Sequence, residues 1–213
     1  MEEPLLYGSD YSVYVRIARL ALIEKGIEHR LVPVDVFAAE GPPDWYRQIH
    51  PFGRIPAFEH DGFRLFETSA ITRYVDEGFD GPPLQPADPR QRARMNQIIA
   101  LLDAYAYRSM VWDIYVETVS KPKSGGEVDE ARVAAAVGVA RTALETLSAL
   151  KANGPFLLGD APSLADLHAA PIFAYFVKAP VSASLMEPHA ELSGWWERMQ
   201  ARSAFAATEP TSG

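Results

Sequence analysis

The spacing of hydrophobic residues changes character near position 80. Before it, short apolar runs alternate with single helical stretches, and from position 90 onward a helical period of three to four residues dominates. The pattern predicts an α/β domain of order β-α-β, loop, β-β-α over residues 1–80 and an all-α domain over residues 90–213.

Local signals place the strands of the first domain. Residues 5–7 are a short apolar run, and residues 13–24 follow at helical spacing. Residues 31–34 are extended but contain Pro33, which cannot donate to a strand ladder, so we expect an edge strand. The turn at His60-Asp61-Gly62 predicts an antiparallel hairpin.

The two domains are separated by a stretch that no regular element tolerates. Positions 78–89 hold six Gly and Pro residues, and we place the linker at 81–89. Beyond it, helical spacing recurs over residues 95–102, 133–150, 164–177 and 192–199. No stretch reaches the roughly 20 apolar residues of a membrane helix, so we expect no membrane span.

Composition narrows the chemistry. The 213 residues are 48% hydrophobic with a net charge of −8 and no long basic run, which argues against a nucleic-acid partner. The chain has no cysteine, so any sulfur chemistry must use a ligand's sulfur. The N-terminus lacks the basic start and apolar run of a secretory signal, so we expect a cytoplasmic location.

Two places could bind a ligand through the backbone. Pro56 follows Ile55 at the start of a strand, as an ordinary strand start or as a cis bond that exposes backbone groups. Glu67 and Thr68 precede a helix whose first N–H groups would attract a carboxylate, although they could be a plain helix cap. The residues alone leave both questions open.

Three segments carry a resemblance. PFGRIPAFEHDGFRLFETSAITRYV resembles the glutathione-binding half of cytosolic glutathione transferases, and LYGSDYSVYVRIARLALIEKGIEHRLVPVD is similar to the start of the plant-type phi class and its bacterial relatives. FLLGDAPSLADLHAAPIFAY resembles the family's folding motif, in which Ser163 and Asp166 form a capping box. The chain is identified as a phi-like bacterial member of this family.

The resemblance implies a thioredoxin-like first domain, glutathione as co-substrate, no metal, and a dimeric, cytoplasmic detoxification enzyme. It makes Ser12 catalytic, pairs the Ile55 backbone with the cysteinyl part of glutathione across a cis bond, and assigns the γ-glutamyl end to Glu67 and Thr68. The implied glutathione-binding set is Ser12, Arg54, Ile55, Pro56, Glu67 and Thr68.

The chain departs from the family pattern in three places. His50 replaces the usual Asn, Thr68 replaces Ser, and Pro42 stands near the family's glycine-binding lysine. Arg54 is a candidate replacement for that missing cation. The homodimer that the family implies has Phe52 as an interface anchor.

One hydroxyl is enough for the implied chemistry. A thiol of pKa roughly 8.5 needs about 2.7 kcal/mol to lose two pKa units, and a hydroxyl hydrogen bond to a charged group gives about 1.5 to 3. Ser12, at the start of the first helix, matches the family's serine, while Tyr7, Ser9 and Tyr11 compete with it. The expected hydrophobic substrate pocket comprises Tyr11, Tyr107, Met110 and Tyr115.

The favoured function is conjugation of the glutathione thiolate to small hydrophobic electrophiles, with glutathione-dependent peroxidase activity as a possible addition. A zeta-type cis-trans isomerase is the second candidate, but its Ser-Ser-Cys signature is absent because Val13 and Tyr14 follow Ser12. A non-catalytic ligand carrier or assembly protein is the third, because fold does not fix function.

Overall fold

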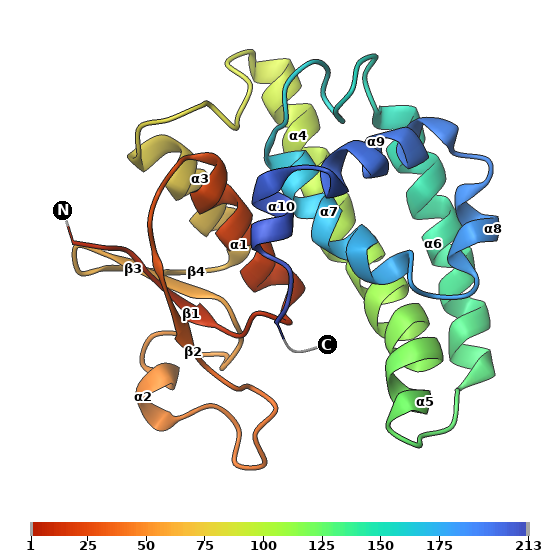
Figure 1. The fold of residues 1–213 in the computed structure, drawn as a ribbon, viewed down its shortest axis with the longest axis horizontal. Helices are drawn as coiled ribbons and strands as arrows, with labels where there is room; N and C mark the ends of the chain where they lie inside the picture. Colours follow the sequence, from red (N-terminus) through yellow and green to blue (C-terminus); the bar gives the residue numbers. More distant parts are fainter. Residues whose placement is uncertain (1, 212–213) are drawn as a thin grey trace. The chain divides into compact units, whose positions relative to one another are not determined.

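The computed structural model describes residues 2–211 and divides into two compact units (Figure 1). The first unit runs to Gln85 and also includes the chain from Arg202 onward, whereas the second is Pro86–Ala201. The first break falls inside the expected linker at 81–89. The second differs from expectation, because the final segment of the predicted helical domain packs in the first unit.

The first unit is built on a four-stranded mixed sheet of order β2-β1-β3-β4. β1 pairs in parallel with β2, whereas the β1–β3 and β3–β4 pairs are antiparallel. β2 lies at an edge, so Pro33 costs no ladder bond on its outer side, as predicted. The strands are β1 (Leu5–Gly8), β2 (Arg30–Pro33), β3 (Ala57–His60) and β4 (Phe63–Phe66).

A tight two-residue turn joins β3 to β4. Asp61 and Gly62 have φ of +48° and +77°, the left-handed values that match the twist of paired strands in a type I′ turn. The hairpin predicted at this Asp-Gly pair is confirmed.

Side chains on opposite faces of the sheet enter different cores, because successive strand residues point to opposite sides. Leu6 is completely buried, as are Ile17 of α1 and Ile71 of α3, the two helices that pack together in Figure 1. Tyr7 instead joins a smaller cluster with Tyr46 of α2. The helices of this unit are α1 (Val13–Glu24), α2 (Asp44–Arg47), α3 (Thr68–Gly78) and α10 (Ser203–Ala207).

The second unit is entirely helical in its regular elements, as the sequence predicts. Its helices are α4 (Pro89–Leu101), η1 (Leu102–Ser120), α5 (Lys121–Lys123), α6 (Glu130–Leu150), α7 (Leu164–Phe176), α8 (Ser182–Met186) and α9 (Ala190–Gln200). The central pairs are α6 with η1 and α7 with η1.

η1 is a π-helix, a wider form than the sequence pattern predicts. Two of its side-chain pairs join residues five apart, as the wider turn allows. Trp112 Nε1 donates to Tyr107 Oη at 2.9 Å, and Arg108 Nε donates to both carboxylate oxygens of Asp113 at 3.0 Å.

Helix α6 corrects one sequence expectation. It has 21 residues, and its 18-residue apolar window has a mean hydropathy of 1.3, so by length and composition alone it could cross a membrane; it is the one such helix among residues 2–211. Its buried residues, Ala136, Ala140, Ala143, Leu144 and Leu147, recur at helical spacing on the face that packs against η1.

The expected capping box is present at the start of α7. Ser163 N and Ser163 Oγ both donate to Asp166 Oδ2 at 2.8 Å. Asp166 is completely buried, and its Oδ1 also accepts from Leu157 N and Trp195 Nε1, each at 2.8 Å. The box therefore ties the preceding loop and α9 to α7.

Candidate functional site

Gly8 brings the start of α1 close to the loop before β3. A methyl group added at Gly8 would collide with Val15 Cγ2 and lie 3.3 Å from Ile55 Cβ. Only glycine allows this approach. The first turn of α1, which carries Ser12, and the Ile55-Pro56 segment therefore meet at the end of β1.

Ser12 is the N-cap of α1, as its sequence position predicts. Its Oγ accepts a long hydrogen bond of 3.4 Å from Val15 N, and its carbonyl oxygen accepts from Arg16 N at 2.9 Å. The side chain is partly exposed, and no acceptor for its hydroxyl proton lies among residues 2–211. The hydroxyl can therefore donate to a ligand at the positive end of α1.

The three competing hydroxyls are engaged differently. Tyr7 Oη donates to Glu59 Oε2 at 3.0 Å, and burial, with Glu59 as the second cause, raises the pKa of Tyr7. Ser9 Oγ donates to Val34 O at 2.7 Å. Burial likewise raises the pKa of Tyr11, whose ring stacks on Phe37 with centroids 5.9 Å apart. These contacts favour Ser12 as the donor to a thiolate.

The Ile55-Pro56 peptide bond is cis, as expected. Neither the N–H nor the carbonyl of Ile55 has a hydrogen-bond partner among residues 2–211, and the residue is half-buried. The preceding carbonyl, that of Arg54, accepts from Tyr46 Oη at 2.6 Å and is fixed in place. Ile55 thus offers one donor and one acceptor on a held segment.

The start of α3 has the character of an anion site. The cap residue, Glu67, has φ +72° and makes no side-chain capping bond, and a non-glycine residue in this region is a sign of functional strain. The backbone N–H groups of Thr68 and Ser69 have no partner among residues 2–211. A carboxylate can bind these donors, while the exposed Glu67 side chain is available to an ammonium group.

Two arginines are available near this site. Arg54 is exposed, and its guanidinium has no ion-pair partner within the described chain. Sequence reasoning missed Arg47, whose guanidinium lies beside Pro42: a methyl group on Gly53 would be 3.0 Å from Pro42 Cγ and 3.3 Å from Arg47 Nη1. The small residues Gly41 and Gly53 leave room for this side chain, a signal that a sequence pattern alone does not reveal.

His50 is the second residue whose environment sequence reasoning missed. It is 3% exposed, and its Nδ1 has no hydrogen-bond partner among residues 2–211. Its ring packs on Phe66 with centroids 4.8 Å apart. Burial lowers the pKa of His50, and the charges of Glu67 and Arg54 act on it in opposite directions, so all three groups are neighbours.

The residues expected to line the electrophile pocket belong to both units. In the second unit Met110 is 1% exposed and lies in the core. Tyr107 and Tyr115 are half-buried: Tyr107 is bonded to Trp112, and Tyr115 packs on Tyr175 with ring centroids 4.9 Å apart. Tyr11, in the first unit, packs on Phe37.

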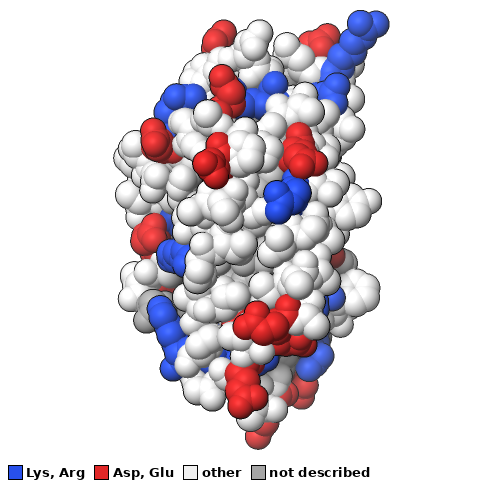
Figure 2. Space-filling view, turned by 90° about the vertical axis from the view of Figure 1, so that its right-hand side faces the viewer, with Lys and Arg blue, Asp and Glu red and all other residues white. Residues whose placement is uncertain are grey.

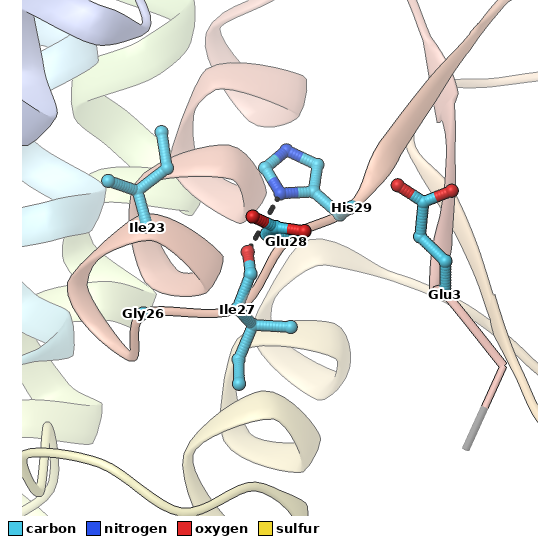
Figure 3. A pocket seen from close by; sticks show the side chains of 6 residues that line it. All are labelled: Glu3, Ile23, Gly26, Ile27, Glu28 and His29. Atoms are coloured by element: carbon cyan, nitrogen blue, oxygen red, sulfur yellow. Dashed lines mark hydrogen bonds between the residues drawn. The ribbon is translucent and has the colours of Figure 1, made fainter.

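A hollow of about 460 Å³ lies at the opposite end of α1 from Ser12 (Figure 3). Its lining includes Glu3, Glu28 and His29, whose Nδ1 lies 3.2 Å from Ile27 O. Two carboxylates make it unsuitable for an anionic peptide. Across residues 2–211 no group of three His, Asp or Glu side chains could hold a metal ion.

Charge is mixed rather than basic on the face drawn in Figure 2, where Lys and Arg are interspersed with Asp and Glu without a continuous basic stripe. The whole chain carries a net charge of −8, so an anionic ligand must be attracted by local donors, not by the overall field.

Comparisons with known proteins agree with this geometry. Residues 6–83 match the glutathione S-transferase N-terminal domain family model, and residues 100–203 match the C-terminal one. A glutathione S-transferase of Hyoscyamus muticus is 30% identical over 94% of this chain and 95% of its own length.

Solved structures give the same result. Glutathione transferase F7 of Populus trichocarpa has a TM-score of 0.83 at 30% identity, covering 96% of this chain and 97% of that one. Maize glutathione S-transferase I, solved with an atrazine–glutathione conjugate, has a TM-score of 0.83 at 25% identity over the whole of both chains. The expected thioredoxin-like α/β domain with a helical domain is confirmed, and the chain belongs to the glutathione S-transferase family.

Proposed function

We propose that this chain is a glutathione transferase in which Ser12 holds the glutathione sulfur as a thiolate. The observation that carries the proposal is the Ser12 hydroxyl, which caps α1, has no acceptor among residues 2–211 and starts the helix that meets the Ile55-Pro56 segment. Family membership supplies the co-substrate, and the contacts of each site residue support the role that we propose for it.

Each part of glutathione has a counterpart in the first unit. The Ile55 N–H and carbonyl pair with the cysteinyl backbone, next to Pro56. The γ-glutamyl carboxylate binds the first N–H groups of α3, at Thr68, and its ammonium group binds Glu67. Arg54, together with Arg47, whose guanidinium lies against Gly41 and Gly53, binds the glycine carboxylate in place of the cation that Pro42 cannot provide.

The Ser12 hydrogen bond and the end of α1 supply enough free energy to lower the thiol pKa of bound glutathione. A drop of two units in the thiol pKa needs about 2.7 kcal/mol, and one hydroxyl bond to the anion gives about 1.5 to 3. The end of α1 adds roughly 0.3 to 1 kcal/mol. No metal or second base is required.

The reaction follows from the thiolate. Its sulfur lone pair forms a bond to an electrophilic carbon, and the leaving group departs with the electron pair of the broken bond. The thiol proton has already passed to solvent. With a hydroperoxide, two glutathione molecules supply the electrons, and the products are glutathione disulfide, an alcohol and water.

The test is the pKa of the bound thiol, measured from thiolate absorbance, together with turnover of a simple aryl halide. In Ser12→Ala we expect the bound-thiol pKa to rise by about two units and turnover at pH 7 to fall about 25-fold, because the thiolate fraction falls from about 76% to about 3%. Ser9→Ala is the matched control, because Ser9 donates to Val34 O. A Ser12→Ala enzyme with the wild-type thiol pKa would exclude Ser12 as the activating group.

The same assay separates the alternatives. Retention on immobilised glutathione without turnover of aryl halides or peroxides would indicate a ligand carrier.

We further propose that the protein is a cytoplasmic homodimer anchored by Phe52, which is 72% exposed. The candidate electrophile contacts are then Tyr11 in the first unit and the half-buried Tyr107 and Tyr115 in the second, whereas Met110 is 1% exposed and cannot contact an electrophile.

A further inference from the structure

The last described residues of the chain run antiparallel to α1. We call residues 202–211 the C-terminal strap. Arg202 binds both carboxylate oxygens of Glu24 at 2.9 and 2.7 Å, at the far end of α1. Ala207 O accepts from Arg19 at 3.2 Å, nearer the middle of the helix. The strap therefore follows α1 back toward Ser12, as the contact of α10 with α1 in Figure 1 shows.

Arg16 is the central contact. Its side chain is 2% exposed, and its guanidinium lies 3.9 Å from the ring centroid of Phe205. It donates to Thr208 Oγ1 at 3.1 Å, to Phe205 O at 3.0 Å and to Glu209 Oε2 at 2.8 Å. A charge this deeply buried is tolerated only with such partners, and these come from the strap.

Arg16 is also joined directly to Ser12. Its backbone N–H donates to the Ser12 carbonyl at 2.9 Å, which closes the first turn of α1. Arg16 thus contacts the strap through its side chain and Ser12, the N-cap of α1, through its backbone N–H.

The strap ends next to the same turn. Thr211 N and Thr211 Oγ1 donate to Asp10 Oδ2 at 2.9 and 2.6 Å, two residues before Ser12. These bonds keep the pKa of Asp10 below its usual value, so the carboxylate stays charged over the working range of pH. Ser12 N in turn donates to Ser9 O at 3.1 Å, within the segment that Asp10 anchors.

We propose that the C-terminal strap positions Ser12, with Arg16 as the principal positioning residue and the Asp10–Thr211 contact as the second. This inference rests on the proposed role of Ser12 in thiolate stabilisation. It makes the ionisation of bound glutathione depend on the final ten described residues, although none of these has an assigned contact with the ligand.

The experiment compares contacts along one strap. Arg16→Met keeps the apolar stem and removes the guanidinium, Arg16→Lys restores the charge, and Thr211→Val removes the hydroxyl bond to Asp10. Arg202→Gln is the matched control, because it breaks the ion pair with Glu24 roughly 18 Å from Ser12 along the helix. Each full-length variant is assayed for bound-thiol pKa, kcat, glutathione KM and melting temperature.

In Arg16→Met we expect the bound-thiol pKa to rise by about one unit, which lowers kcat about tenfold below that pKa while glutathione KM changes less than about twofold. Arg16→Lys should recover part of the shift, and Thr211→Val should show a smaller one. Arg202→Gln should lower the melting temperature with the thiol pKa unchanged. If Arg16→Met does not fold, Arg16→Lys and Thr211→Val still carry the test.

Two results would overturn the inference. One is an unchanged thiol pKa in the folded Arg16 and Thr211 variants, and the other is an equal shift in Arg202→Gln, which would show general loosening. A lowered thiol pKa in the wild type that only Ser12→Ala abolishes would remove the strap's role and leave the proposed function standing. A wild-type thiol pKa equal to that of free glutathione would remove both.

Discussion

At the scale of single residues, hydrogen-bond partners separate four hydroxyls that the sequence places within six positions. Tyr7 and Ser9 donate to Glu59 and to Val34 O, and burial raises the pKa of Tyr11. The Ser12 hydroxyl is the one of the four that keeps a proton to donate to a ligand. The sequence names the candidates, but only the fold shows where each hydroxyl points.

The replacement of a glycine-binding lysine leads to a prediction about the two arginines. Arg47→Gln and Arg54→Gln should each raise the glutathione Kd about fivefold, the loss of roughly 1 kcal/mol expected for an exposed ion pair. Calorimetry checks this. Arg92→Gln, on the exposed face of α4, is the control.

A modified ligand makes that test more specific. Glutathione with its glycine carboxyl esterified should bind the wild type and both arginine variants with the same affinity, because the charge that the arginines contact is gone. Unequal affinities for the ester would show that the arginines act elsewhere on the ligand or on the fold.

His50 leads to a prediction about pH. Burial lowers its pKa in the folded state, so below pH about 6.5 the unfolded chain binds the proton more readily. The contribution of the neutral, buried His50 ring to the unfolding free energy is fully present above that pH and declines as the pH falls toward the folded-state pKa. His50→Asn should lose less unfolding free energy than the wild type between pH 7 and pH 5.

Urea denaturation at both pH values measures this difference. Parallel losses in the two proteins would contradict it, and titration of the His50 ring by NMR would show independently whether its pKa is lowered.

At the scale of elements, local signals predicted what local geometry determines. The Asp61-Gly62 turn, the edge position of Pro33 and the Ser163–Asp166 box are all where the sequence places them. The C-terminal strap was not predicted, because α10 has only five residues and its contacts lie almost 200 positions away in sequence. A helical arginine such as Arg16 reads as a surface residue until its distant partners are known.

The contrast between local signals and distant contacts also explains where the sequence prediction and the structure differ at α6 and η1. Hydropathy alone does not separate the packed face of α6 from a membrane helix, and the wide turn of η1 has no signature in a period of three to four residues. In the candidate site, Ser12, Ile55 and Thr68 follow from motifs, whereas Arg47 and the buried His50 depend on loop packing that only the structure reveals.

Asp166 leads to a prediction at this scale. Asp166→Asn keeps the Oδ1 acceptor for Leu157 and Trp195 but presents an NH₂ group to the Ser163 N–H. We expect a loss of about 3 kcal/mol in unfolding free energy, because two charge-assisted bonds are lost in a buried site. Chemical denaturation measures it, with the exposed Asp160→Asn as the control; equal midpoints would refute the structural role of the box.

At the scale of the whole molecule, the exposed ring of Phe52 leads to a prediction about assembly. Phe52 is 72% exposed, and its ring centroid lies 6.3 Å from that of Phe66. One side of the ring therefore packs on Phe66 while the rest is open to a partner. Phe52→Asp should convert the proposed homodimer to a monomer, because a charge replaces a buried aromatic anchor. Analytical ultracentrifugation checks this, with Phe37→Asp, 65% exposed, as the control; identical sedimentation of all three proteins would remove Phe52 from the interface.

The first unit takes residues from both ends of the chain, and this affects how the protein is made. While the ribosome has released only residues 1–85, the Arg16 guanidinium lacks Phe205 O, Thr208 and Glu209. The face of α1 that Phe205 covers in the complete fold is then open to water, and the Arg16 guanidinium is solvated instead of bonded. The contacts that bury Arg16 can therefore form only after residues 205–209 have been made, and these follow the whole helical unit of residues 86–201 in the chain.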